Sequence, residues 1–313
     1  MISGVEDLRG NPRRVRKEGL VRGLLFASAL VSILISALIV WTLFREAWTF
    51  VSKLSADTGL SSLWDRGARP GWYPRDGRFD IATILIGTLL VSIVAMLVAT
   101  PLGLGAAIYL SEYSKPRARR WLKPIIELLA SIPSVVLGYF AIRFLGPKII
   151  QPLFDTTAPK NLLVTGLAVG ILVTPLMASI TEDALRSVPG SLREASYGIG
   201  ARKSVTTIKV VLPAAISGIV AAFILAVSRA IGETMIAALA SGALGQAART
   251  VHPTDTGLTM TAAMAQLASG TDNVAGSGLA FQSLFFVGAV LFLITLALNT
   301  VGDRFVQRVR NRY

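Results

Sequence analysis

The sequence predicts an all-α, polytopic membrane protein with six transmembrane helices. Of its 313 residues 53% are hydrophobic and 16% are charged, and the mean hydropathy is +0.62. Soluble domains carry about 25% charged residues. The hydrophobic residues here are also gathered into long uncharged runs, as membrane helices require. Such runs lack the two-residue alternation of a membrane β-barrel, so helices are the predicted element.

Six segments are long and apolar enough to cross a bilayer, for which a helix needs about 20 apolar residues. In chain order they are 23–44, 81–111, 125–150, 161–181, 210–242 and 273–302. Four of these contain no charged residue at all. Glu127 and Arg143 interrupt the third, and Arg229 and Glu233 interrupt the fifth.

The third segment is the weakest of the six, and the positive-inside rule provides a test of it. With six spans, the loops on one side of the membrane carry 20 Lys and Arg residues and those on the other side carry 10. With five spans, every later loop changes sides and the counts become 15 and 15. The bias favours six spans in the cytoplasmic membrane, with both termini in the cytoplasm.

These spans divide the chain into five regions. They are a basic cytoplasmic tail (1–22), the first span (23–44), an extracytoplasmic loop (45–80), a core with five further spans (81–301) and a cytoplasmic tail (302–313). No small-residue cleavage site follows the first span, so we expect a retained anchor and not a signal peptide. In the extracytoplasmic loop, Trp64, Trp72 and Tyr73 are expected to anchor at the membrane interface. Segment 254–279, rich in small residues, is expected to form a short surface helix and a loop.

The composition excludes several kinds of site. The chain has no Cys and a single His, which excludes disulfides, thiolate metal sites and histidine-rich centres. Its net charge of +13 lies in loops between apolar segments, so nucleic acid is not an expected partner. No G-x-x-x-x-G-K-[ST] phosphate-binding loop occurs. We therefore expect no catalytic residue, no metal and no cofactor on this chain, and any ATP hydrolysis must come from another chain.

Segment 182–213, which follows the fourth span, is predicted to form two short helices that meet at a bend. Ser191 and Glu194 have the spacing of a capping box at the start of the first helix. Gly200 lies at the bend, and the second helix begins near Ser204. A compact knob of this kind suits docking into a groove of a partner. The alternative is that Glu194 is only a helix cap and Gly200 only a turn.

This segment resembles the EAA loop of ABC-importer permeases. The residues that carry the resemblance are Glu194, Ala195, Gly200, Val210, Leu212 and Pro213. The sequence departs from the family pattern at Ser196, where alanine is usual, and at Val210, where isoleucine is usual. The resemblance implies a MetI-like permease architecture. It also implies that the loop docks onto a cytoplasmic ATPase subunit and transmits nucleotide-driven closure to the membrane helices.

Arg229 and Glu233 lie one helical turn apart in the fifth span and are expected to share a face. A charge at the centre of a membrane helix costs about 2.5–3.5 kcal/mol and is a candidate functional group by default. The fork of Arg229 suits an oxyanion such as phosphate. Glu233 would hold the arginine in place or repel anions until the path opens. The alternative is a self-neutralising pair buried between helices.

Thr88 and Ser92 in the second span are weaker candidates for the same pathway. They lie one turn apart and carry hydroxyl groups that can donate to an anion. The alternative is that they donate to backbone carbonyls or to neighbouring helices, as such residues commonly do in membranes.

The stretch RAIGETM at 229–235 resembles the permease subunits of the phosphate-specific importer. Met235, the long 45–80 loop and residues 259–263 favour the PstC-type subunit over its PstA-type sister. The resemblance implies a phosphate path that includes Arg229, Glu233 and Thr234. It also implies four partner chains: a PstA-type permease, two PstB-type ATPases that bind ATP and Mg, and an extracytoplasmic PstS-type binding protein.

Other functions stay open at this point. Within the permease class, the chain could be the PstA-type sister or a permease for another oxyanion, such as sulfate or molybdate. Outside it, a secondary transporter would be expected to show inverted repeats, and we find no convincing internal repeat. A membrane enzyme would need a grouped nucleophile and base or metal ligands, and none is grouped convincingly.

Overall fold

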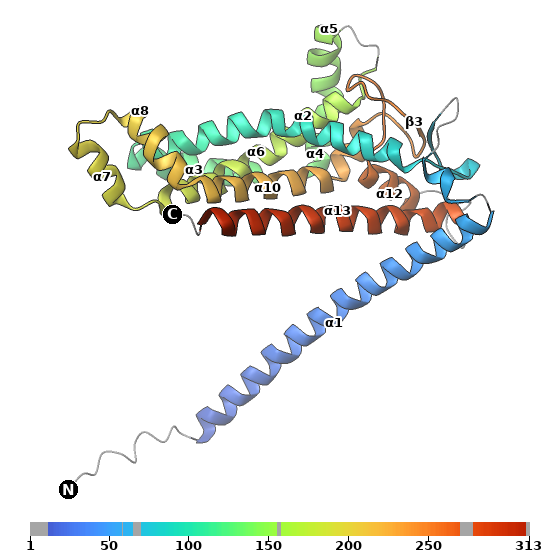
Figure 1. Ribbon diagram of the computed structural model, residues 1–313, viewed down its shortest axis with the longest axis horizontal. Helices are drawn as coiled ribbons and strands as arrows, with labels where there is room; N and C mark the ends of the chain where they lie inside the picture. The colour runs from blue at the N-terminus through green and yellow to red at the C-terminus, as the bar shows by residue number, and fades with distance from the viewer. Residues whose placement is uncertain (1–11, 58, 65–69, 155–157, 270–277, 311–313) are drawn as a thin grey trace.

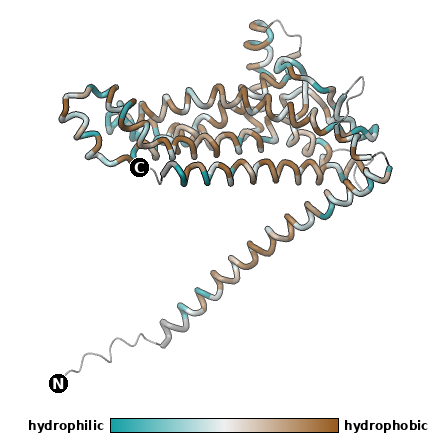
Figure 2. Tube along the Cα trace, viewed as in Figure 1, coloured by the Kyte–Doolittle hydropathy of each residue, from teal (hydrophilic) through white to brown (hydrophobic). Residues whose placement is uncertain are grey.

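The protein is a bundle of long helices from which the first helix projects at an angle (Figure 1). The structure, a computed structural model, describes residues 12–57, 59–64, 70–154, 158–269 and 278–310. Four helices are long and apolar enough to cross a membrane. They are α1 (Pro12–Asp57), α2 (Ile81–Ile108, continued by η4, Tyr109–Tyr113), α6 (Leu162–Ser187) and α13 (Leu279–Arg310). Figure 2 shows hydrophobic residues along the middle of these helices.

Two further segments qualify as spans only as pairs of helices joined at a bend. The first pair is α3 (Pro116–Ala130) and the segment Ser134–Phe154, which meet at 84°. That segment comprises α4 (Ser134–Phe140), η5 (Ala141–Ile150) and α5 (Gln151–Phe154). Pro133 lies at this bend, where the missing N–H and the ring of proline interrupt a helix. By length and composition, the described chain thus contains four candidate spans, or up to six if each bent pair is one span.

The second bent pair connects the predicted knob to the fifth span. Residues Lys203–Ala214 meet α10 (Ile216–Gly232) at 70°. Four short helices lie before the bend: α7 (Gly190–Gly198), α8 (Lys203–Thr206), η6 (Thr207–Val211) and α9 (Leu212–Ala214). After α10, the chain continues as α11 (Met235–Ala240) and later as α12 (Met260–Ala268).

A small antiparallel sheet, which the sequence did not predict, closes the end of the bundle opposite α7. Its strands are β1 (Gly71–Tyr73), β2 (Arg78–Phe79) and β3 (Ala247–Ala248), in the order β2-β1-β3, with η2 (Leu60–Trp64) and η3 (Pro74–Asp76) beside them. Trp72 lies opposite Phe79 on one side and Ala247 on the other. Trp72 is fully buried, with its ring 5.9 Å from that of Phe79. The expectation that Trp72 is an interfacial anchor was therefore wrong, whereas Trp64 is exposed.

One buried ion pair holds this end of the bundle together. Asp80, at the start of α2, has no exposed surface, and the guanidinium of Arg249 binds both of its carboxylate oxygens at 2.6 and 3.1 Å. Arg249 also donates its backbone N–H to the carbonyl of Pro70 at 3.0 Å. A buried carboxylate requires such a partner, because an unpaired charge is costly to remove from water. The pair thus fixes the segment after β3 against the start of α2.

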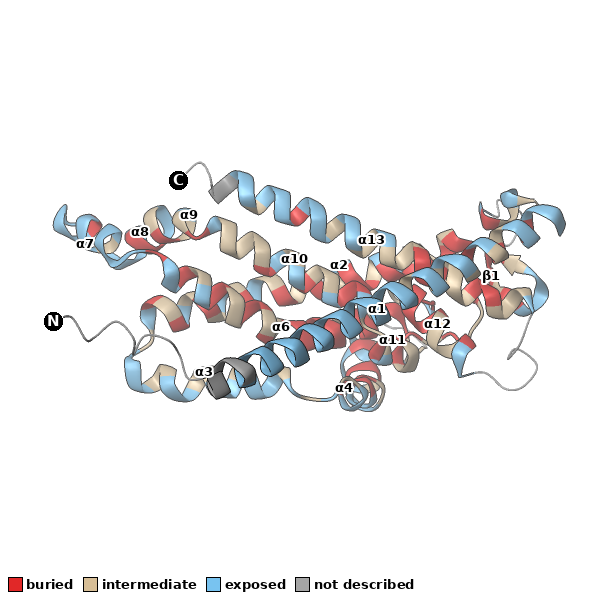
Figure 3. Ribbon diagram, turned by 90° about the horizontal axis from the view of Figure 1, so that it is seen from below, coloured by how far each residue is buried: buried red, intermediate tan, exposed pale blue. Residues whose placement is uncertain are grey.

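The middle of the bundle is held by close packing of small side chains between α2 and α6. Ala95 and Ala99 of α2 and Ala168 of α6 are almost completely buried there. Small residues let membrane helices approach closely, where van der Waals contact takes the place of the hydrophobic effect. Figure 3 shows the buried residues concentrated along these central helices.

Helix α12 is buried in a second hydrophobic cluster, nearer the sheet, although the sequence predicted a surface helix in segment 254–279. Met260 and Ala262 have no exposed surface, and α12 packs against α13 and α2. The backbone N–H of Met260 donates to the Thr88 hydroxyl at 2.9 Å. Small residues here indicate tight burial and not an exposed connector.

Helix α1 is longer than the predicted 23–44 span and largely separate from the bundle. It runs from Pro12 to Asp57, so it includes part of the predicted 1–22 tail and part of the 45–80 loop. Its residues from Lys17 to Leu38 are all exposed, whereas Phe50 and Leu54 near its end are buried (Figure 3). The exposed apolar stretch of α1 is suited to lipid or to a partner helix, whereas its end near Asp57 packs against the bundle.

Replacement of Gly87 by alanine should destabilise the fold. A Cβ at Gly87 would lie 2.2 Å from the carbonyl oxygen of Leu258, so the segment leading into α12 must move. Overpacking of this kind costs about 1–3 kcal/mol. The measurement is the midpoint of thermal unfolding in detergent, and Gly105→Ala in the same helix is the control because nothing lies within 4 Å of its Cβ position. Equal midpoints for the two variants would contradict the close approach.

Candidate functional site

The predicted knob is present at one end of the bundle, where α7 and α8 project beyond the long helices (Figure 1). Helix α7 ends at Gly198, and Gly200 has a φ of +81°, which glycine adopts without steric cost. Helix α8 begins at Lys203. The two predicted helices and the bend at Gly200 are thus confirmed. The predicted capping box was wrong, because Pro189 is the N-cap of α7 and no side chain caps this helix.

Glu194 has its carboxylate on the outside of the knob. Both Glu194 and Ala195 are exposed, and Glu194 makes no hydrogen bond or ion pair with any residue that the structure describes. Its neighbours Tyr197 and Ile199 are also exposed, Ile199 by 87%. The interpretation of Glu194 as only a helix cap therefore fails. Helix α7 presents a mixed acidic and apolar surface that no part of the described chain covers.

Arg193, which the sequence analysis missed, fastens α7 to the bundle. Its guanidinium donates to the Glu112 carboxylate of η4 at 2.8 Å. It also donates to the carbonyls of Leu185 and Val188, at 2.8 and 2.7 Å. The Glu112 side chain is only 4% exposed. A cation beside the last carbonyls of a helix is a recognisable signal, and Arg193 lies six residues after the end of α6 (Ser187).

Ser196 explains one departure from the family pattern. Its hydroxyl lies 2.8 Å from that of Thr206 in α8, and both side chains are buried. The hydrogen bond joins the two helices of the knob, so serine here has a structural partner that alanine would not have.

The root of the knob meets three long helices. Ala107 of α2, Leu185 of α6 and Ala215 at the bend before α10 belong to one buried cluster, and Leu212 of α9 packs against that cluster. Pro213 is exposed in α9. The root of the knob is therefore in direct contact with the ends of α2 and α6 and with the start of α10.

A second buried carboxylate ties α3 to the end of α6. The Glu182 side chain is 1% exposed and pairs with Arg119 and with Lys123, the latter at 2.8 Å. Lys123 also pairs with Asp183 at 2.7 Å. Breaking such a buried pair leaves an uncompensated charge and is strongly destabilising.

Arg229 and Glu233 do not form the expected pair. Helix α10 ends at Gly232, and Glu233 has extended backbone, so the two residues do not lie on one continuous helix face. Glu233 accepts hydrogen bonds from the backbone N–H groups of Met235 and Ile236, at 3.2 and 3.3 Å. Arg229 is exposed, and its guanidinium makes no hydrogen bond or ion pair within the described chain. The self-neutralising pair is therefore excluded in this structure.

The other three pathway candidates use their hydroxyl groups internally. Thr88 donates to the carbonyl of Ile84 and Ser92 to that of Thr88, both at 2.8 Å, and both residues are buried. These bonds are the alternative that the sequence analysis left open, and they take the single donor of each hydroxyl. Thr234 donates to the carbonyl of Gly232 at 3.1 Å, next to the break between α10 and α11.

The described residues offer no evident metal site. Within the ranges that the structure covers, no group of three or more His, Cys, Asp or Glu side chains could hold a metal ion. The paired carboxylates Asp80, Glu112 and Glu182 are each neutralised by an arginine or lysine. None of these three carboxylates is therefore free to bind a cation from outside the chain.

Comparison with known proteins agrees with this geometry. Residues 99–313 match the family model described as binding-protein-dependent transport system inner membrane component. The chain belongs to this family. It is 33% identical over 257 residues to phosphate transport system permease protein PstC 1 of Mycobacterium tuberculosis, covering 76% of this chain and 75% of that one. It is also 32% identical over 226 residues to PstA 1 of the same organism, covering 71% and 67%.

A solved structure supports the fold. The permease matches a chain in the crystal structure of a bacterial alginate ABC transporter in complex with a periplasmic protein that binds an alginate pentasaccharide. The TM-score is 0.64, and the match covers 95% of this chain and 98% of that one. At 13% sequence identity, this likeness concerns the fold alone.

Replacement of Arg193 by alanine should loosen α7 from the bundle. The change leaves the buried carboxylate of Glu112 without its cation, which costs about 3–5 kcal/mol for a buried pair. We expect a lower unfolding midpoint and faster hydrogen exchange in α7. Arg202→Ala is the control. Arg202 is exposed, and its substitution removes the same charge from the same knob. Unchanged exchange in α7 after Arg193→Ala would contradict the fastening role.

Proposed function

We propose that this chain is the PstC-type permease subunit of an ATP-driven importer that carries inorganic phosphate across the cytoplasmic membrane into the cell. The observation that carries the proposal is Arg229, an exposed arginine without a partner in the described chain, in a span of a PstC-like permease. Its guanidinium is free to bind an oxyanion through two parallel hydrogen bonds. The PstC match covers more of the chain than the PstA match, which favours the PstC type.

The proposed assembly contains four further chains. A PstA-type permease covers the exposed side of α10, two PstB-type ATPases bind ATP and Mg, and a PstS-type binding protein delivers phosphate from outside. Glu194 and the exposed surface of α7 dock onto one ATPase. The excess of Lys and Arg on the loops of this side supports placing α7 and both termini in the cytoplasm.

The proposed transport cycle uses two unpartnered side chains: Glu194, which contacts the ATPase, and Arg229, which contacts phosphate. Closure of the ATPase pair on ATP moves α7, and the Arg193–Glu112 link passes this movement to η4 and α2. The spans tilt to open outward, and phosphate released by the binding protein meets Arg229. Hydrolysis of ATP on the partner chains returns the path to its inward-facing state. Glu233, held by the N–H groups of α11, adds negative charge near Arg229 and so limits how long phosphate stays.

The decisive experiment is uptake of radiolabelled phosphate by cells with and without this chain. Uptake of sulfate by the same cells is measured as the control. Selective loss of phosphate uptake in the deletion strain supports the proposal. Loss of sulfate uptake alone would reassign the substrate and leave the permease class in place.

Arg229→Gln should reduce phosphate uptake by about tenfold or more, because one charge-assisted hydrogen bond contributes about 1.5–3 kcal/mol. Phosphate uptake by Arg229→Lys should lie between that of the wild type and that of Arg229→Gln, since lysine keeps the charge but lacks the guanidinium fork. Arg304→Gln, at an exposed position near the end of α13, controls for loss of a positive charge. Normal uptake by Arg229→Gln, at equal amounts of assembled complex, would remove Arg229 from the pathway.

Glu194→Lys should release the ATPase or uncouple it from transport. The substitution reverses a charge on the proposed docking surface without removing any side-chain hydrogen bond or ion pair within the described chain. The measurement is co-purification of the ATPase and its turnover in reconstituted vesicles. Glu18→Lys, an equal charge change on the exposed part of α1, serves as the control. An ATPase that co-purifies and turns over normally with Glu194→Lys would exclude the docking role.

A further inference from the structure

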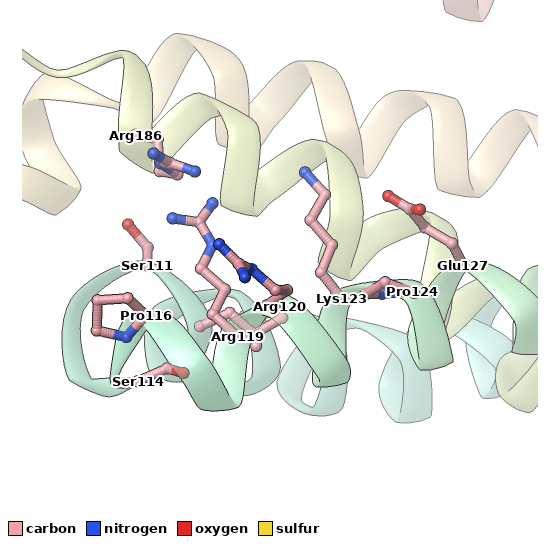
Figure 4. A pocket seen from close by; sticks show the side chains of 10 residues that line it. Ser111, Ser114, Pro116, Arg119, Arg120, Lys123, Pro124, Glu127 and Arg186 are labelled. Atoms are coloured by element: carbon pink, nitrogen blue, oxygen red, sulfur yellow. The ribbon is translucent and has the colours of Figure 1, made fainter.

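A second group of cations lies at the α7 end of the bundle. The proposed transport path does not use these residues. A cavity of about 640 Å³ opens between α3 and the end of α6, beside η4. Four cations line it: Arg119, Arg120 and Lys123 of α3, and Arg186 of α6. Figure 4 shows the guanidinium groups of Arg119, Arg120 and Arg186 gathered in the space between the two helices.

Only two of these four cations have a partner in the described chain. Arg119 and Lys123 pair with the buried Glu182. Arg120 and Arg186 are exposed to the cavity and make no hydrogen bond or ion pair with any described residue. Glu127, the acidic residue of the lining, lies at the far end of the group (Figure 4). Like charges that face one cavity repel each other, and a bound anion would relieve that repulsion.

The shape and chemistry of the cavity select the kind of anion. Its volume is in the range of small-molecule sites, about 300–1,000 Å³. Guanidinium forks match the oxygens of a phosphate group, whereas the Ser111 and Ser114 hydroxyls of the lining already donate to Glu112 and to the carbonyl of Lys115. Leu110, Pro116 and Pro124 give it an apolar wall as well. Basic pockets between membrane helices on the cytoplasmic side are suited to phospholipid headgroups.

We propose that this cavity binds a phosphate group, carried either by an anionic phospholipid or by free inorganic phosphate. The group would lie between Arg120 of α3 and Arg186 of α6 and would accept hydrogen bonds from both guanidinium groups. Arg186 is in the last turn of α6, four residues before α7 begins. An occupied site therefore restrains α3 relative to α6 at the root of the knob. The cavity is lined by residues of α3 and α6 and not by Arg229 of α10, so this proposal does not require the proposed transport path.

The test measures binding to the purified, delipidated full chain in a neutral detergent. One arm titrates inorganic phosphate by calorimetry. The other adds phosphatidylglycerol, with phosphatidylcholine for comparison, and counts bound lipids by native mass spectrometry. The test variant is Arg120→Gln with Arg186→Gln, two exposed positions where loss of folding is not expected. The matched control is Arg117→Gln with Arg202→Gln, which removes the same charge from exposed positions outside the cavity lining.

The proposal expects the test variant to lose affinity for one of the two probes by at least tenfold, with the control within twofold of the wild type. Loss confined to phosphatidylglycerol assigns the site to a lipid headgroup, and loss confined to inorganic phosphate assigns it to the free ion. The test variant and its control both retain Arg229, so any phosphate bound in the transport path contributes equally to both titrations. Equal binding by the test variant and the wild type, or binding of neither probe to the wild type, would overturn the proposal.

Discussion

A carboxylate that is removed from water must be paired with a cation, and this constraint organises both ends of the bundle. At the knob end, Glu112 takes its cation from α7, through Arg193, and Glu182 takes two from α3. At the opposite end, Asp80 takes its cation from Arg249. Each pair joins elements that are far apart in the sequence, so the ion pairs determine which segments meet where the apolar helices end.

Arginine thus serves two purposes in this protein, depending on whether a carboxylate lies within reach of its guanidinium. Arg193 is saturated by Glu112 and by carbonyls at the end of α6, which makes it a rigid connection. Arg229 is unsaturated because α10 ends at Gly232 and the backbone of α11 takes the Glu233 carboxylate instead. The break between α10 and α11 therefore separates the Glu233 carboxylate from the Arg229 guanidinium, and the guanidinium stays available to a ligand.

The sequence predicted those structural features that depend on residues close together in the chain. Hydropathy located the long helices, and the glycine at 200 located the bend of the knob, because both signals are local. Hydropathy could not reveal that Trp72 is buried, since its partners belong to α1, β2 and β3. The small residues of α12 suggested an exposed connector, but they permit tight packing. Arg229 and Glu233 were expected on one face because spacing alone does not show where a helix ends.

The pairing of Asp80 with Arg249 has a consequence for biosynthesis. The two residues are 169 positions apart. At about 5–20 residues per second, roughly 8–34 seconds of translation separate them. During that interval α2 is already made, while the aspartate at its start still has no cation and must stay hydrated. The sheet that needs β3 cannot close either. The sheet end of the bundle is thus completed only after four-fifths of the chain has left the ribosome, and premature burial of Asp80 would be resisted by its own charge.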